Sequence, residues 1–236
     1  MRTDIIVVGY NTPEFEANTL SAIIAHTSYG TYQITYAQNA RDNSLASFWN
    51  ELIATSTCEQ ICLLNPDTVP AMNWLGVMHA VLRRDPNIGA VVPSSNLVHV
   101  SQVLVPFPRM EQDWSKINTF ARTLVLEGSL DCLTLSAMCV LFRKSTWHEA
   151  GGFDTDFPLY GEDSEFFWRV RTKLNKRLVW CRSTYCHHYG QQCTTKAATD
   201  GEFDYVEMRK RAMELFIRKT GYSYQTHGAL EQLERA

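Results

Sequence analysis

Short apolar runs alternate with longer segments of helical period in the first half of the chain. The apolar runs predict strands over 5–8, 32–37, 60–64 and 89–92. Apolar positions three and four residues apart predict helices over 14–28, 45–55 and 74–84, with Pro13 suited to open the first. Continuous β-branched runs are typical of strands buried in parallel sheets. The order therefore predicts an α/β fold with a doubly wound, mostly parallel sheet flanked by helices.

The second half of the chain is less regular. Residues 94–128 are polar, contain two prolines and have no clear period, which predicts an irregular excursion rather than a linker between domains. The later elements are predicted as a strand over 133–143, a turn at 151–154, a helix over 162–173, a strand over 176–180 and an amphipathic helix over 202–219. We expect that last helix to lie on the outside of a single domain.

The composition narrows the classes of function. Hydrophobic residues make up 45% of the 236, charged residues make up 20%, and the formal net charge is -3, as in a folded globular protein. Without a long basic run, nucleic acid is not expected as a partner, because binding of its phosphates needs clustered positive charge. No apolar run approaches ~20 residues, so no transmembrane segment is predicted. The opening residues lack a signal-peptide pattern, and we expect a cytoplasmic protein.

The seven cysteines predict neither a disulfide framework nor a zinc site. Their number is odd and their spacing scattered, unlike the cysteines of a small disulfide-rich domain. Cys181, Cys186 and Cys193 lie near His187 and His188, but they lack the close pairing of structural zinc ligands. We interpret the cysteines as small buried hydrophobic residues.

Polar residues follow three of the predicted strands, where open parallel sheets bind their ligands. They are Tyr10, Asn11 and Pro13 after the first strand, Asn39 after the second, and Asn65 and Asp67 after the third. The glycine-rich fingerprints of dinucleotide folds and P-loops are absent from the first strand's end. Asp67 could begin the oxygen shell of a hard divalent cation that a diphosphate completes. Alternatively, Asp67 belongs to a turn that caps the following helix.

A second acidic cluster is formed by Glu162, Asp163 and Glu165 at the start of a predicted helix. Carboxylates are favourable at that position even without a function, because the helix dipole attracts them. Three acids this close also repel one another, which raises at least one pKa and suits the group to general-base catalysis. Arg169, farther along the same helix, could pair with these acids or face a phosphate.

His187 and His188 lie at the end of the last part of the predicted sheet. An imidazole at that place could join Asp67 and phosphate oxygens around a metal ion. A histidine there could equally be structural.

Taken together, four motifs resemble family 2 glycosyltransferases of the GT-A fold, in particular the bacterial branch with rhamnosyltransferase-like enzymes. They are VVGYNTP at 7–13, LLNPDT at 63–68, GGFD at 151–154 with YGEDSE at 160–165, and HHYGQ at 187–191. The second is similar to the family's Asp-x-Asp metal motif with Asn65 in the place of the first Asp. The likeness extends over residues 4–195 in the family's order, and 216–222 resembles the tail that follows.

The resemblance implies an inverting transfer from a nucleotide-diphosphate sugar, with UDP- or dTDP-sugars expected, to a glycan, lipid-linked or protein acceptor. It assigns the catalytic base to Asp163, with Glu162 beside it. Mn²⁺ or Mg²⁺ would be held by Asp67 and a histidine, for which we favour His187 over His188. The expected contacts to the nucleotide-sugar are Tyr10, Asn11, Pro13, Asn39, Asn65, Asp67 and Arg169.

The same resemblance implies that residues 1–236 form a single domain with three parts. Residues 4–93 would form the nucleotide-binding half, 94–195 the acceptor and catalytic half, and 196–236 a C-terminal helical tail.

The sequence also departs from the family's pattern. Gln38 and Asn39 stand where the family usually has Asp-Asn, with Asp42 as another candidate for the carboxylate, and Glu165 stands where Asp is frequent. Because of Gln38, one alternative is a degenerate nucleotide-sugar-binding or scaffold protein. The other is a nucleotidyltransferase that makes the activated sugar, although the basic glycine-rich loop of those enzymes is missing after residue 8.

Overall fold

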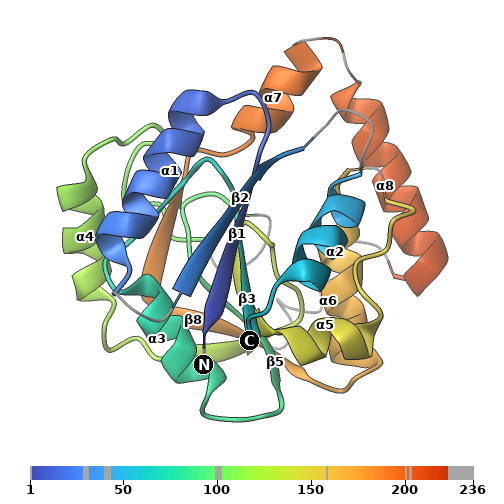
Figure 1. Cartoon of the computed structure of the whole chain (residues 1–236), viewed down its shortest axis with the longest axis horizontal. Helices are drawn as coiled ribbons and strands as arrows, with labels where there is room; N and C mark the ends of the chain where they lie inside the picture. Colours follow the sequence, from blue (N-terminus) through green and yellow to red (C-terminus); the bar gives the residue numbers. More distant parts are fainter. Residues whose placement is uncertain are drawn as a thin grey trace.

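The fold is an open, twisted α/β sheet with helices on both faces (Figure 1). This computed structural model describes residues 2–28, 32–39, 44–98, 103–157, 159–199, 201 and 204–222. The strands are β1 (Thr3–Gly9), β2 (Tyr32–Gln38), β3 (Gln60–Leu64), β4 (Thr68–Pro70), β5 (Ile88–Ser94), β6 (Ser129–Cys132), β7 (Cys139–Arg143) and β8 (Arg177–His188). Their order is β2-β1-β3-β7-β5-β8-β4, and β6 pairs with β8. Strands β1, β2, β3, β5 and β8 share one direction, and β4, β6 and β7 run against it.

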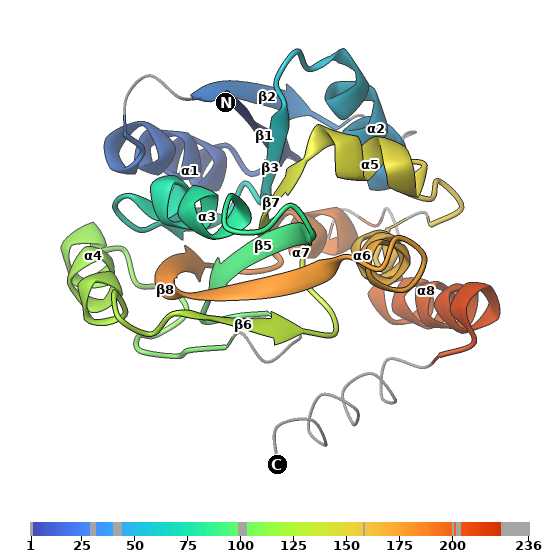
Figure 2. The same cartoon turned by 90° about the horizontal axis from the view of Figure 1, so that it is seen from below.

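Two groups of helices cover the two faces of the sheet. The helices are α1 (Pro13–His26), α2 (Leu45–Thr55), α3 (Trp74–Leu82), α4 (Trp114–Thr123), α5 (Lys144–Ala150), α6 (Glu162–Thr172), α7 (Gln192–Thr199) and α8 (Tyr205–Thr220). Figure 2 shows α1 and α3 on one side of β1 and β3, and α2 and α5 on the other. A hydrophobic core lies on each face of the sheet, and successive residues of β1 point into opposite cores. Ile5 packs with α1 and α3, and Ile6 packs with α2, α5 and α6.

Most elements predicted for the first half are confirmed, because their apolar signal is local and strong. The strand β4 was not predicted, since three residues are too few to show a period. The predicted irregular segment 94–128 contains α4, whose start is capped by Asp113 accepting from the N–H groups of Ser115 and Lys116 at 2.9 and 3.4 Å. That polar cap was visible in the sequence.

The second half also differs in three smaller ways. Only 139–143 of the predicted strand 133–143 forms β7, and β6 precedes it as a partly exposed edge strand. The last predicted strand does not stop at 180 but continues as β8 to His188. The helices α5 and α7 were not predicted, since both are short.

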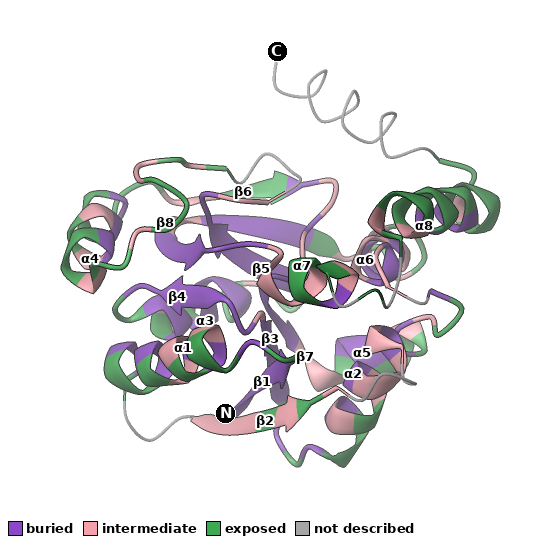
Figure 3. Cartoon of the chain, turned by 90° about the horizontal axis from the view of Figure 1, so that it is seen from above, coloured by how far each residue is buried: buried purple, intermediate pink, exposed green. Residues whose placement is uncertain are grey.

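The helix α8 is an integral part of the fold. Leu215 and Phe216 pack against Phe157 and against Trp168 of α6, and Figure 3 shows α8 next to the largely buried ribbon of α6. On the same helix, Lys219 lies 2.5 Å from Asp154 and 2.6 Å from Asp156 of the turn before α6. The end of the predicted tail, 223–236, lies outside the described residues. Among the helices of the described residues, none has the length and apolarity needed to cross a membrane.

We expect Phe216→Ala to destabilise the protein by about 3 kcal/mol, because it leaves a cavity where a fully buried ring packed. Urea unfolding followed by circular dichroism measures the change. The matched control is Val206→Ala on the same helix, whose side chain is 74% exposed; we expect it to change the free energy of unfolding by less than about 0.5 kcal/mol. Equal effects of the two substitutions would show that α8 does not depend on this contact.

Candidate active site

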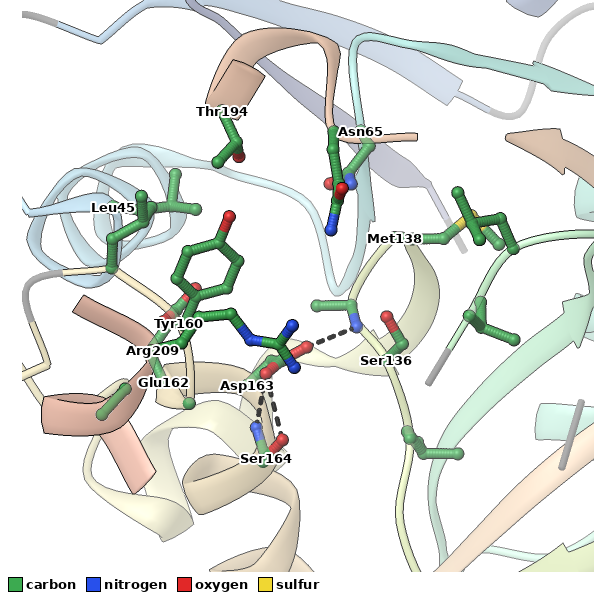
Figure 4. Close-up of a pocket in the computed structure, with 18 of the residues that line it drawn as sticks. Leu45, Asn65, Ser136, Met138, Tyr160, Glu162, Asp163, Ser164, Thr194 and Arg209 are labelled. Carbon is green, nitrogen blue, oxygen red and sulfur yellow. Dashed lines mark hydrogen bonds between the residues drawn. The ribbon is translucent and has the colours of Figure 1, made fainter. Parts of the chain in front are cut away.

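A pocket of about 500 Å³ opens where the carboxyl ends of β3 and β8 meet the start of α6. Asn65 lines it from the loop after β3, His188 from the end of β8, and Glu162 and Asp163 from the first turn of α6 (Figure 4). Four segments remote in the sequence, counting α8 with its Arg209, therefore place polar side chains in one cavity. Such a convergence of polar groups in a concave site is typical of ligand binding.

Asp67 is buried beside this pocket and is held in place by three segments. Its Oδ1 lies 3.2 Å from His188 Nε2, and its Oδ2 accepts a hydrogen bond from the N–H of Gln192 at 3.1 Å. Its own carbonyl accepts from the N–H of Tyr189 at 2.9 Å. The Thr19 hydroxyl of α1 donates to the carbonyls of Pro66 and Thr68 at 2.7 and 2.8 Å, which holds the surrounding turn. The carboxylate is thus positioned by the fold and not by a local cap.

The charges of Asp67 and His188 stabilise each other. Burial alone would raise the pKa of Asp67, but the adjacent His188 and the hydrogen bonds bring that pKa below its ordinary value. Burial alone would lower the pKa of His188, but the carboxylate of Asp67 brings it above its ordinary value. Each group therefore favours the charged form of the other.

His188, and not His187, is the histidine beside Asp67, which corrects our preference. His188 Nδ1 lies 2.8 Å from the carbonyl of Leu97, to which it donates, so Nε2 is the nitrogen that faces Asp67. The fully buried His187 instead places Nε2 2.9 Å from the carbonyl of Arg109. Successive residues of a strand point to opposite faces, so only one of the pair can reach the carboxylate.

The donor atoms around Asp67 fit a divalent cation. An ionised carboxylate and a neutral imidazole whose second nitrogen is hydrogen-bonded to a carbonyl are suitable ligands, so a cation would take the place of the proton on Nε2 of His188. Within the described ranges, no group of three or more His, Cys, Asp or Glu side chains gathers as a metal site. A cation bound by Asp67 and His188 would therefore need oxygen ligands from a substrate or from water, which a diphosphate can supply.

Asp163 is partly exposed in the pocket, and backbone groups orient its carboxylate. Oδ2 accepts from the N–H of Ala137 at 3.0 Å, and Oδ1 accepts from the N–H of Ser164 at 2.7 Å and from its hydroxyl at 3.3 Å. These hydrogen bonds hold the group in one orientation toward the cavity (Figure 4). A carboxylate placed in this way can accept a proton from a bound hydroxyl.

Glu162, the neighbour of Asp163, has a different environment. It is 5% exposed, and its Oε2 is buried without a hydrogen-bond partner in the described structure. Burial and the negative charge of Asp163 raise the pKa of Glu162 to about 8. The predicted rise of at least one pKa in the acidic cluster thus falls on Glu162, with burial as its main cause and the charge of Asp163 as the second.

Arg169 pairs with an acid of its own helix, which is one of the two roles predicted for it; the other, a contact with the nucleotide-sugar, stays a prediction. Its Nε and Nη2 donate to the two carboxylate oxygens of Glu165 at 2.6 and 2.7 Å. The same guanidinium also donates to the carbonyl of Gly152 at 2.8 Å and to that of Ala150. This bidentate pair holds the turn before α6, and neither partner is among the residues that line the pocket.

Of the residues predicted to contact the nucleotide-sugar, Asn65 lines the pocket, whereas those that follow β1 and β2 are not among its lining residues. Tyr10, Asn11 and Pro13 follow β1, and Asn39 follows β2, where its N–H donates to the carbonyl of Gly9 at 3.0 Å. Asp42 lies outside the described residues. Sequence reasoning missed Glu16, which accepts hydrogen bonds from the backbone N–H groups of Tyr10 and Thr12.

The helix α8, which the sequence places on the outside of the domain, also forms one wall of the pocket. Arg209, Ala212 and Met213 line the cavity from this helix, and Figure 4 shows Arg209 directed inward near Tyr160 and Asp163. Ala212 is buried, whereas Arg209 and Met213 are exposed although they line the pocket. The amphipathic pattern of α8 was therefore readable from the sequence, but the elements that its inner face contacts were not.

We expect the free energy of unfolding to fall as the pH rises from about 4.5 to 8, in part because of Glu162. Over this range the carboxyl ionises in the unfolded chain, while in the folded protein it stays protonated up to its pKa of about 8. Glu162→Gln should remove this part of the dependence and gain roughly 3 kcal/mol more at pH 7.5 than at pH 4.5, relative to wild type. Urea unfolding at both pH values is the measurement. The exposed Glu214→Gln is the control, and an equal pH profile in wild type and Glu162→Gln would contradict the expectation.

Solved structures share the fold of this chain, whereas comparison of its sequence with known families and proteins finds no relative. No family model matches the chain, and no curated protein sequence matches it. Among solved structures, GalNAc-T7 with UDP, GalNAc and Mn²⁺ is similar over 79% of this chain at a TM-score of 0.59 and 12% identity. A mannosyltransferase, PcManGT from Pyrobaculum calidifontis, in complex with GDP-Man and Mn²⁺, is similar over 99% of this chain at a TM-score of 0.63 and 15% identity. The chain spans 43% of the first and 68% of the second. These likenesses confirm the predicted GT-A fold.

Proposed function

We propose that this protein is a metal-dependent inverting glycosyltransferase that moves a sugar from a nucleotide-diphosphate sugar to an acceptor hydroxyl. The observation that carries the proposal is the shared pocket of His188, which pairs with Asp67, and Asp163. A cation site and a base at one cavity are the two parts that such a displacement needs. The Mn²⁺ and the UDP or GDP-Man in the two similar structures support the same assignment. We further propose family 2 and its rhamnosyltransferase-like branch, on the four motifs.

Asp67 and His188 would hold Mn²⁺ or Mg²⁺ at the donor diphosphate. When bound, the cation would supply Lewis-acid stabilisation of the leaving diphosphate. Asn65, which lines the pocket near His188, would contact the donor, and Tyr10, Asn11, Pro13 and Asn39 would bind its nucleoside part, with UDP- or dTDP-sugars as the expected donors. Residues 4–93 would then form the donor half of the domain.

Asp163 would act as the base toward the acceptor. Its carboxylate, oriented by the N–H groups of Ala137 and Ser164, would take the proton of the acceptor hydroxyl as the oxygen attacks the anomeric carbon. Attack opposite to the leaving diphosphate inverts the configuration and requires no nucleophile from the protein. Glu162, which is largely protonated near pH 7, would bind the acceptor through a hydrogen bond to one of its oxygens. The acceptor class remains a glycan, lipid-linked or protein hydroxyl.

We expect Asp163→Asn to lower the rate of transfer at least 100-fold, about the lower end of what a general base contributes, and to leave donor binding unchanged. The amide keeps the size of the side chain and can still accept from Ala137, but it cannot take the proton. Transfer is followed by release of nucleoside diphosphate, and donor affinity by calorimetry. Lost donor affinity together with unchanged turnover would contradict this role.

We expect the two neighbouring histidines to differ in metal-dependent binding. His188→Gln should weaken Mn²⁺-dependent nucleoside diphosphate binding about tenfold or more, whereas His187→Gln should leave it within twofold of wild type. A thermal-shift series with UDP, dTDP and GDP, with and without Mn²⁺, reports both, since a ligand of the folded state raises its apparent stability. Any loss of intrinsic stability is read from the ligand-free samples. A flat response of folded wild-type protein would contradict the proposed function.

A further inference from the structure

A buried carboxylate on α1 holds the loop that follows β1. Glu16 lies one turn into α1 and is 2% exposed. Its Oε1 accepts from the N–H groups of Tyr10 and Thr12, both at 3.0 Å, and from the Thr12 hydroxyl at 3.1 Å. These hydrogen bonds determine where the backbone of residues 10–12 lies, although Glu16 itself belongs to the next element.

The other oxygen of Glu16 reaches the neighbouring strand. Oε2 accepts from the hydroxyl of Tyr36 and from Nε2 of Gln38, each at 2.5 Å. Gly9 makes the room for this arrangement, because a Cβ there would lie 2.7 Å from Cδ of Glu16 and 2.8 Å from Nε2 of Gln38. One carboxylate therefore links the loop after β1 to the end of β2, at the edge of the sheet where α/β folds bind ligands.

This link also determines which end of the Gln38 amide faces outward. An ionised carboxylate only accepts hydrogen bonds, so Gln38 must turn its NH₂ group toward Glu16. Hydrogen bonds to Glu16 keep the carboxyl charged against the opposing effect of burial, since its pKa is below the ordinary value. Gln38 is exposed and thus presents Oε1, an acceptor, to a ligand at the end of β2.

We propose that Glu16 is a positioning residue of the nucleoside site, which holds Gln38 so that its carbonyl oxygen accepts from an N–H of the base or an O–H of the ribose. This inference rests on the proposed function, because it requires a nucleotide donor. In this arrangement the amide oxygen of Gln38 is the hydrogen-bond acceptor at the end of β2, in the place of a carboxylate oxygen. A neutral amide is sufficient for this contact because Glu16 orients it.

The test compares three variants against two ligands in the presence of Mn²⁺. Glu16→Gln places a donor where only acceptors fit, Gln38→Leu removes the acceptor and keeps the loop's hydrogen bonds, and the exposed Glu14→Gln on the same helix is the matched control. The ligands are the nucleoside diphosphate that wild-type protein binds most tightly and inorganic pyrophosphate, which has no nucleoside. Calorimetry gives the dissociation constants.

We expect Glu16→Gln and Gln38→Leu to weaken nucleoside diphosphate binding about fivefold or more, the value of one hydrogen bond, and to leave pyrophosphate binding within twofold. Glu14→Gln should change neither. The 2′-deoxy analogue of the nucleoside diphosphate identifies the partner of Gln38. If Gln38→Leu no longer weakens binding of this analogue, the partner is the 2′-hydroxyl; if it still does, the partner is another ribose hydroxyl or the base. If Glu16→Gln does not fold, Gln38→Leu alone decides, because its side chain is exposed.

Two results overturn the inference while the proposed function stands: unchanged nucleotide binding in both variants, or an equal loss for nucleotide and pyrophosphate, which would indicate general damage to the fold. Wild-type protein that binds neither ligand would overturn the proposed function and, with it, this inference.

Discussion

The contact between Asp67 and His188 depends on the shortest strand of the sheet. The antiparallel pairing of β4 with β8 aligns Thr68 with His188, and the preceding residue then lies against the imidazole. A buried carboxylate is costly without a partner, and so is a buried imidazolium; together they offset much of each other's desolvation. The pair therefore holds the start of β4 against the end of β8 and, in the same contact, creates the arrangement that we propose for a cation.

The choice between His187 and His188 could not be made from the sequence for a physical reason. Alternation along a strand decides which face each residue takes only while the pairing is regular. The register of β5 against β8 shifts between Pro93 and Ser94, whose partners are Cys181 and Tyr185. This irregularity breaks the alternation that begins in 177–181 before it reaches the histidines. The strand was also expected to end at 180, so its later residues had no predicted register.

Sequence patterns that lie within one helix or strand predicted the fold well. Contacts between residues of different elements, on which the site depends, were predicted less well. The helix 45–55 and the strand 60–64 were found at the bounds that the structure gives, because their patterns involve only neighbours in the chain. The sequence left open whether Arg169 pairs with the acids of its helix or with a phosphate. In the structure its guanidinium donates to Glu165 and to the carbonyl of Gly152. Glu16 was missed because it lies one position beyond the usual capping-box residue, and its other partners come from β2. Asp163 entered the pocket as expected, since the motif that contains it begins a helix.

Two adjacent acids at one helix end acquire different chemistry from their surroundings. Asp163 is partly exposed and receives hydrogen bonds from Ala137 and Ser164, whereas Glu162 is buried with an oxygen that has no partner in the described structure. Burial and the negative charge of Asp163 together favour the neutral form of Glu162. At neutral pH the pair thus brings close to one negative charge to a pocket that, in the proposed reaction, also receives a diphosphate. A second full charge would repel that donor, so the unpartnered burial of Glu162 favours donor binding.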